Sequence, residues 1–223
     1  MRETLFSSTE GRLLGLGLAL TALMLLALGI GWVVFPDSVL TYAAMTGLNL
    51  VIGRAAGLAF GYASGLGHAQ VIPFNMLVET TKVLVLYPLF VLSWRQLIRV
   101  PGLQPFVQRM HSAAELRGGV VRKFGIAGLF VFVLAPFWMT GPVAGAIIGF
   151  LAGLRARVIL PVVLGATYLA IGVWGLLLNE LSDWAASVNR FAPYVLVLAM
   201  VLIAAALHGL GRVRERRAYR KQL

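Results

Sequence analysis

The stretch "APFWMTGP", Ala135 to Pro142, interrupts an apolar run that extends from Phe124 to Leu154. Each of its two prolines, Pro136 and Pro142, lacks an amide donor and disrupts a helix interior, and Gly141 permits a turn between them. The run on either side is about 12 residues, or roughly 18 Å of helix, which is too short for a hydrocarbon core of ~30 Å. Broken backbone at membrane depth is tolerated only where protein or water covers it. We therefore predict a re-entrant helical hairpin over residues 124–154, with one kinked helix that crosses the membrane as the alternative.

The composition around this stretch is that of a membrane protein. The chain has 223 residues, of which 60% are hydrophobic and 12% are charged, and its mean hydropathy is +0.88. A soluble domain of this size could not bury so much apolar surface, so a single polytopic membrane domain is expected. The chain contains no cysteine, which leaves out a disulfide framework and a thiolate metal site, and its three histidines form no ligand pattern. No metal and no cofactor are expected.

The hydrophobic pattern predicts an all-α integral membrane protein. The expected segments are transmembrane helices at 13–35, 70–94, 158–178 and 191–209, a hairpin or full span at 39–66, an amphipathic cytoplasmic loop at 95–123, the hairpin at 124–154 and a basic cytoplasmic tail at 210–223. A capping box from Ser7 to Glu10 predicts the start of the first helix. That helix is too long for a signal-peptide core, so we expect a retained anchor. Residues 179–190 are expected to form a short loop.

The positive charge is concentrated in a few short segments. The net charge is +11, and the basic residues gather in 95–123, in 210–223 and at Arg155 and Arg157. Short basic loops beside apolar helices lie in the cytoplasm, so we expect a multi-pass protein of the bacterial inner membrane with a cytoplasmic C-terminus. Nucleic-acid binding is not expected, because no fold for it is present. Both ends of 124–154 then lie on one side, which favours the hairpin.

The first half of the chain repeats this pattern in a weaker form. If residues 39–66 form a hairpin that enters from the opposite side, then each hairpin is followed by a long helix. That order is the inverted repeat of many transporters. Glycines four residues apart, at Gly53, Gly57, Gly61 and Gly65, favour close helix packing there.

Arg54 is the sharpest candidate for a binding residue. A guanidinium at membrane depth costs at least ~2.5 kcal/mol on insertion scales, so it needs a partner or water. Arginine binds oxyanions with two parallel hydrogen bonds, which predicts recognition of a phosphate or carboxylate head group. The alternatives are a structural pair with Glu79 or a hairpin tip that lies at shallow depth.

Asn75, Glu79 and Lys82 lie at i, i+4 and i+7, which places them on one helical face. A buried glutamate can carry a coupling proton, so these three residues are candidates for proton coupling. The alternative is a Glu79–Lys82 pair at i, i+3 that is satisfied internally and has no transport role.

The turn of the second hairpin is the other candidate for binding. Pro136, Thr140, Gly141 and Pro142 surround the start of its second helix, where free amides and the helix dipole favour an anion. The alternative is simple N-capping by Thr140.

The segment from Arg122 to Leu160, "RKFGIAGLFVFVLAPFWMTGPVAGAIIGFLAGLRARVIL", resembles the putative small multidrug export protein family. The resemblance lies in an aromatic-Gly-x-x-Gly-Leu run, a Pro-x-x-x-Thr-Gly turn and glycines at Gly145, Gly149 and Gly153. Upstream, "GRAAGLAFGYASGLG" places Arg54 on the arginine of a family motif whose acidic residue and proline are absent here, where Leu58 takes the place of the proline. That family is similar in turn to the DedA/VTT superfamily. The resemblance implies two opposed re-entrant hairpins and, as for some DedA-like proteins, translocation of polyprenyl phosphate or phospholipid.

We therefore expect a secondary transporter or lipid flippase for an anionic amphiphile, with a lipid that carries an anionic or isoprenoid phosphate as its partner. A homodimer is a compatible assembly. The alternatives are an exporter of a small solute, ion or drug, and a non-transporting assembly or stability factor of the membrane. Enzymatic activity is not expected, because the sequence contains no nucleophile–base pattern, metal cluster or nucleotide-binding loop.

Overall fold

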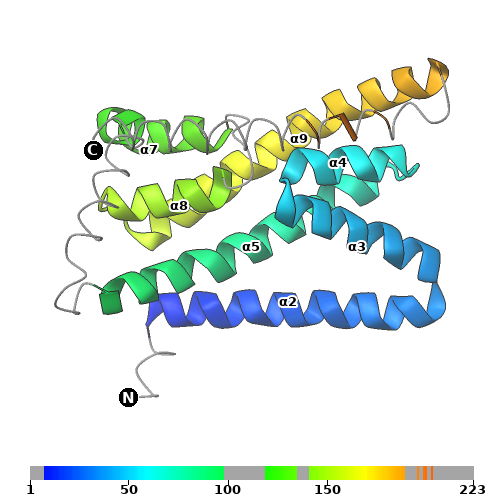
Figure 1. Ribbon diagram of the computed structural model, residues 1–223. Helices are drawn as coiled ribbons and strands as arrows, with labels where there is room; N and C mark the ends of the chain where they lie inside the picture. The colour runs from blue at the N-terminus through cyan, green and yellow to red at the C-terminus, as the bar shows by residue number, and fades with distance from the viewer. Residues whose placement is uncertain are drawn as a thin grey trace, which may run out of the picture.

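The computed structural model describes residues 8–97, 119–134 and 141–188, together with positions 195, 198, 199 and 202 (Figure 1). All regular elements of this described part are helices, so the predicted all-α class is confirmed there. They are α2 (Thr9–Val34), α3 (Pro36–Val51), α4 (Arg54–Ala63), α5 (His68–Leu97), α7 (Gly119–Leu134), α8 (Gly141–Leu151) and α9 (Ala156–Val188). Among them, three helices are long and apolar enough to cross a membrane, namely α2, α5 over His68–Trp94 and α9 over Ala156–Leu181.

The N-cap of helix α2 lies one residue later in the chain than predicted. The side chain of Ser8 accepts a hydrogen bond from the amide of Gly11 at 3.0 Å, which makes Ser8 the N-cap. The expected cap at Ser7 was therefore wrong, because the hydroxyl next to the first helical residue, Thr9, reaches the free amides.

Residues 39–66 fold as two antiparallel helices, α3 and α4. A Cβ atom on Gly57 would lie 3.1 Å from Cβ of Asn49, and one on Gly61 would lie 2.9 Å from Cε of Met45. The chain reverses at Gly53, whose φ of 126° suits glycine alone. The evenly spaced glycines thus serve two purposes, since Gly57 and Gly61 permit close packing while Gly53 permits the reversal.

Helices α7 and α8 form a second antiparallel pair. Gly145 of α8 packs against Val133 of α7, and Gly149, one turn further, packs against Leu129. Each helix is short, with 16 residues in α7 and 11 in α8. Residues 135–140, which include most of the predicted turn, lie outside the described residues.

The long helices α5 and α9 cross in opposite directions at the centre of the molecule (Figure 1). The hydroxyls of Thr80 and Tyr168 lie 2.6 Å apart, and a Cβ on Gly175 would lie 3.1 Å from Cγ1 of Ile72. Each short helix packs on the long helix that follows the other pair: α4 contacts α9, and α8 contacts α5. One apolar core fills the space among α5, α7, α8 and α9, and a second joins α3, α4, α5 and α9.

Helix α9 continues to Val188, through most of the stretch that the sequence analysis assigned to a loop. The loop assignment over residues 179–188 was therefore wrong. Glu180 and Asp183 suggested the loop, but two acidic residues near the end of a long apolar helix do not stop it, because glutamate is a good helix former.

Candidate functional site at the meeting point of the two helix pairs

Arg54 joins the first helix pair to the second. It is the first residue of α4, directly after the reversal at Gly53, and only 8% of its surface is exposed. Its Nη2 donates a hydrogen bond to the carbonyl oxygen of Val133 at 3.2 Å. Val133 lies in the last turn of α7, where carbonyls have no intrahelical donor and the helix dipole favours a cation. The turn of the α3–α4 pair thus meets the end of α7.

A chain of buried polar side chains lies beside this contact, on α5 and α3. Nζ of Lys82 lies 2.7 Å from Oε1 of Glu79 and donates to Oδ1 of Asn49 at 3.0 Å. Nδ2 of Asn49 donates to Oδ1 of Asn75 at 3.0 Å, and Nδ2 of Asn75 donates to the carbonyl of Val71 at 2.9 Å. We call Asn49, Asn75, Glu79 and Lys82 the polar cluster. The ion pair predicted from i, i+3 spacing is formed, and all three residues of the predicted helical face are buried.

Asn49 is the member of the cluster that sequence reasoning did not select. It is fully buried and bridges Lys82 and Asn75, which are 33 and 26 residues away in the chain. A buried amide needs hydrogen-bond partners, so an asparagine within an apolar helix was the available signal. The identity of its partners depended on how α3 packs.

Gly57 makes room for the cluster. A Cβ atom at this position would lie 2.7 Å from Oδ1 of Asn75 and 3.1 Å from the carbonyl oxygen of Met45. The absence of a side chain therefore lets α4 lie directly against the two asparagines, and it brings the N-terminus of α4 close to them.

The site buries charges of both signs. Among the described residues, the buried charged side chains are Arg54, Glu79 and Lys82, which are two cations and one carboxylate. Glu79 attracts Arg54 electrostatically as well as pairing with Lys82. Oε2 of Glu79 is buried without a hydrogen-bond partner in the described part of the molecule. A carboxylate oxygen in that position is a natural acceptor for a proton or a polar ligand.

The other predicted binding residues are only partly described. Gly141 and Pro142 are buried at the start of α8, where a proline removes no intrahelical hydrogen bond. Pro136 and Thr140 lie outside the described residues, so an anion contact or cap at Thr140 stays a prediction. Val133 precedes this stretch directly, so Arg54 is held at the same end of the second pair.

Within the described ranges, no three histidine, aspartate or glutamate side chains come close enough together to hold a metal ion. The polar cluster offers amides, an ammonium and one carboxylate, which is a set suited to hydrogen bonding and charge recognition.

Comparison with known families gives one match. A family model described as "Putative small multi-drug export protein" matches residues 54–173. The match begins at Arg54, runs from α4 into α9 and covers more than half of the 223 residues. No curated protein and no solved structure matches the chain.

Proposed function

This chain belongs to the family of putative small multi-drug export proteins, and we propose that it is a secondary transporter of an anionic amphiphile, such as a polyprenyl phosphate or a phospholipid. The family match supports the transport of a small solute across a membrane. The three apolar helices long enough to span a bilayer support the same location. The anionic class of the cargo rests on the charge of the buried site.

The observation that carries the proposal is that Arg54 and Lys82, two cations, are both buried in the described part of the site. A buried cation in a low-dielectric interior is costly, and an anion that binds beside it lowers that cost. The planar guanidinium of Arg54 can bind a phosphate with two parallel hydrogen bonds, and the ammonium of Lys82 adds a point charge. A phosphate head group is therefore the ligand that suits these side chains best.

We further propose that α3–α4 and α7–α8 are re-entrant hairpins that meet within the bilayer. Helices α4 and α8 have 10 and 11 residues, which is roughly 15 Å of helix and about half of a hydrocarbon core. Their turns hold polar groups at membrane depth, where a cavity or protein must cover them. Such broken helices supply the binding sites of many transporters.

A constant spacing supports the further proposal of an inverted repeat. Thr80 of α5 and Tyr168 of α9, which touch, are 88 residues apart in the chain. The same 88-residue offset relates the first residues of α5 and α9, the last residues of α4 and α8, and the prolines Pro73 and Pro161. Contact between equivalent residues is what a pseudo-two-fold axis through the α5–α9 crossing produces. The polar cluster lies in the first repeat only, so the transporter has one site rather than two.

Glu79 gives the site a means of coupling to protons. When Glu79 is ionised it neutralises one of the two cations, and when it takes up a proton the site gains one positive charge. The anion and the proton therefore bind to the same state of the transporter, so the two cross the membrane in the same direction. An exporter driven by an inward proton gradient needs the opposite relation, in which binding of the proton weakens binding of the cargo.

Transport by purified protein in liposomes tests the role of Arg54. We expect Arg54→Ala to lower the rate of flipping of a fluorescent phosphate-bearing lipid by about 100-fold, since the loss of a charged partner costs about 3 kcal/mol. Arg12→Ala is the control, because Arg12 is an exposed arginine of α2. Equal rates for the Arg54 variant and the wild type would remove Arg54 from the site.

The coupling proposal has a separate test at Glu79. We expect Glu79→Gln to keep anion binding and to lose the dependence of transport on an imposed pH gradient. A variant that retains the full response to the gradient would show that another group carries the proton.

A drug-like or other small solute is the second candidate cargo, and the family description favours it. The two candidate cargoes differ in charge and in the direction in which they move relative to the proton. Uptake of an uncharged or cationic solute in exchange for protons, with no response to Arg54→Ala, would favour this alternative over the anionic amphiphile.

A further inference from the structure

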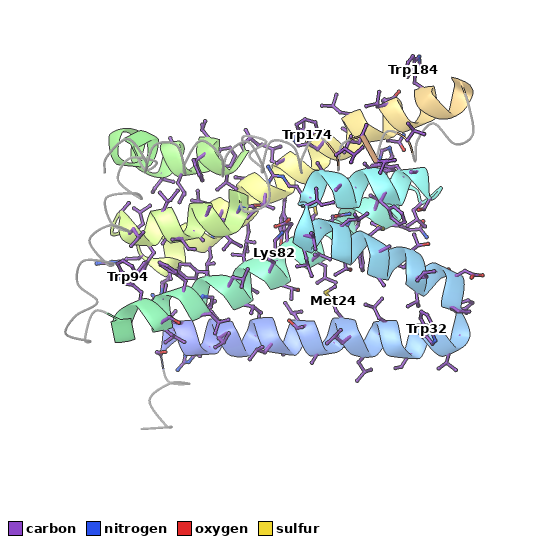
Figure 2. All side chains as sticks on the ribbon, in the orientation of Figure 1. Met24, Trp32, Lys82, Trp94, Trp174 and Trp184 are labelled. Atoms are coloured by element: carbon purple, nitrogen blue, oxygen red, sulfur yellow. The ribbon has the colours of Figure 1, made fainter. Side chains whose placement is uncertain are left out.

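An apolar cavity lies between α2, α3 and α5. Its volume is about 450 Å³, within the range of pockets that hold small-molecule ligands. Leucine, methionine, alanine, valine and phenylalanine side chains make up most of its lining, and Ser38 and Tyr42 are its polar members. Figure 2 shows Met24 pointing from α2 toward α3 and α5, into this space.

Glycine contacts close both ends of the cavity. At one end, Gly17 of α2 lies so close to α5 that a Cβ atom would be 2.8 Å from the carbonyl carbon of Leu84. At the other end, Gly31 lies against Val39, the first turn of α3, where a Cβ would be 2.7 Å from Cγ2. Between these contacts α2 is held away from α5 and α3 over a stretch of 14 residues, about 21 Å of helix. The cavity is therefore built by two fixed contacts, and it is more than an exposed apolar face.

The cavity adjoins the polar cluster on two sides. Met24 lines the cavity, and its sulfur accepts a hydrogen bond from the hydroxyl of Thr81 at 3.7 Å. Thr81 precedes Lys82 of the cluster. On the other side, Tyr42 and Phe74 form the wall with their rings 4.8 Å apart.

Each of those two aromatic residues is also close to a member of the cluster on its own helix. Phe74 precedes Asn75 on α5. Tyr42 lies seven residues before Asn49, which puts the two on one face of α3 at a separation of about 10 Å. An apolar compartment and a polar cluster that contains the ammonium of Lys82 thus lie side by side, an arrangement that suits an amphiphile with an anionic head group and an apolar tail.

We propose that this cavity holds the hydrocarbon tail of the anionic amphiphile while its phosphate binds at the polar cluster. The inference rests on the proposed function, because it takes the cluster as the anion site. An apolar cavity in a bilayer fills with hydrocarbon rather than water, and the ammonium of Lys82 in the adjacent cluster favours a chain that carries an anionic head group. Met24 lies between the two compartments, and its flexible thioether can move aside for a tail.

Binding of two probes to the full-length protein in nanodiscs tests the proposal. The probes are dodecyl phosphate, which has a long tail, and ethyl phosphate, which has the same head and almost none. Ala27→Phe fills the cavity from α2, and Ala22→Phe makes the same change on the exposed opposite face of that helix. We expect Ala27→Phe to weaken dodecyl phosphate binding by about tenfold, as overpacking of a fitted cavity does. Binding of ethyl phosphate, and both affinities of Ala22→Phe, should stay within about twofold of wild type.

The outcomes separate this inference from the function on which it rests. If wild-type protein binds neither phosphate, the anionic cargo fails and the tail site with it. If it binds dodecyl phosphate and Ala27→Phe does so equally well, the cavity is not the tail site, although the anion site stands.

Photolabelling of the unaltered chain covers the case in which Ala27→Phe does not fold. An alkyl phosphate with a diazirine at the end of its tail should label α2 near Met24, and unlabelled dodecyl phosphate should compete. Labelling that dodecyl phosphate does not displace would indicate a resident membrane lipid, and crosslinks between two copies at Met24 would indicate a dimer interface. Either result overturns the proposal.

Discussion

At the scale of single residues, the ammonium group of Lys82 is shared between the carboxylate of Glu79 at 2.7 Å and the amide oxygen of Asn49 at 3.0 Å. The pair lies where water cannot screen it, since Glu79 is 1% exposed and Lys82 9%. Taking both charges out of water costs as much as their attraction returns, so the intact pair adds little net stability. Removing one partner leaves the other charge buried without its direct ion-pair contact, and that is the expensive state.

Removal of Lys82 should therefore cost more than removal of the whole pair. We expect Lys82→Met to destabilise the protein by about 3–5 kcal/mol, because the buried carboxylate of Glu79 loses its ion-pair partner and the amide oxygen of Asn49 loses its donor. The double variant Glu79→Gln with Lys82→Met should recover a large part of that loss. Thermal unfolding in detergent, arranged as a double-mutant cycle, measures both. Additive effects in the cycle would mean that the two charges do not interact.

Gly57 gives a second prediction for a single residue. We expect Gly57→Ala to destabilise the protein and to slow transport, because the new methyl group must displace Oδ1 of Asn75 from 2.7 Å and the Met45 carbonyl from 3.1 Å. Gly47→Ala on α3 is the matched control, since nothing lies within 4 Å of a Cβ there. That change should be neutral or stabilise the helix by up to ~1 kcal/mol. The melting temperatures of the two variants give the comparison, and similar values would show that α4 tolerates a wider spacing.

At the scale of elements, α2 lies directly against the backbone of α5 at Gly17. Pro88 of α5 has no amide hydrogen to donate to the carbonyl of Leu84, one turn earlier. Gly17 of α2 lies against that carbonyl, where a Cβ would be 2.9 Å from the oxygen. A proline that weakens one helix thus creates the surface on which a glycine of the next helix packs, through weak Cα–H contacts of the kind found between close helices.

This contact predicts opposite results for two glycines of α2. Gly17→Ala should lower stability by about 1–3 kcal/mol, because the clash is with backbone and cannot be relieved by a side-chain movement. Gly29→Ala has open space around it and should be neutral or slightly stabilising. The shift in unfolding temperature on each change is the measurement. A neutral Gly17→Ala would mean that α2 can dock at a greater distance.

At the scale of the whole molecule, two helix pairs approach each other from opposite directions and meet through Arg54 and Val133. The long helices α5 and α9 cross between them, and each short helix packs on the long helix that follows the other pair (Figure 1). If the pairs are re-entrant, the two ends of each pair lie on one side of the membrane, and the two pairs open to opposite sides.

The chain contains no cysteine, so single cysteines can report this topology without removal of native ones. We expect cysteines at Lys123 and Arg155 to react with an impermeant maleimide from the same side of oriented vesicles. A cysteine at Gly67, which follows the first pair, should react from the opposite side only. Reaction of Lys123→Cys and Arg155→Cys from opposite sides would rule out the second re-entrant hairpin.

Local spacing explains what the sequence could predict. The helical class and the Glu79–Lys82 pair both depend on residues within a few positions of one another. Helix geometry sets those relations before any packing occurs. The same reasoning was less reliable at helix ends, as the cap at Ser8 and the continuation of α9 to Val188 show, because ends are decided by contacts of one or two residues.

The sequence by itself determined that this chain forms apolar helices interrupted at glycine and proline, with charged residues placed where a bilayer makes them costly. Only the tertiary structure decided which groups meet those charges. Arg54 contacts Val133 across 79 residues of chain, and Lys82 contacts Asn49 across 33. The physical reason is that a helix fixes the direction of a side chain from its own neighbours, whereas its partner depends on how distant helices pack, and here glycines without side chains decide how closely they approach.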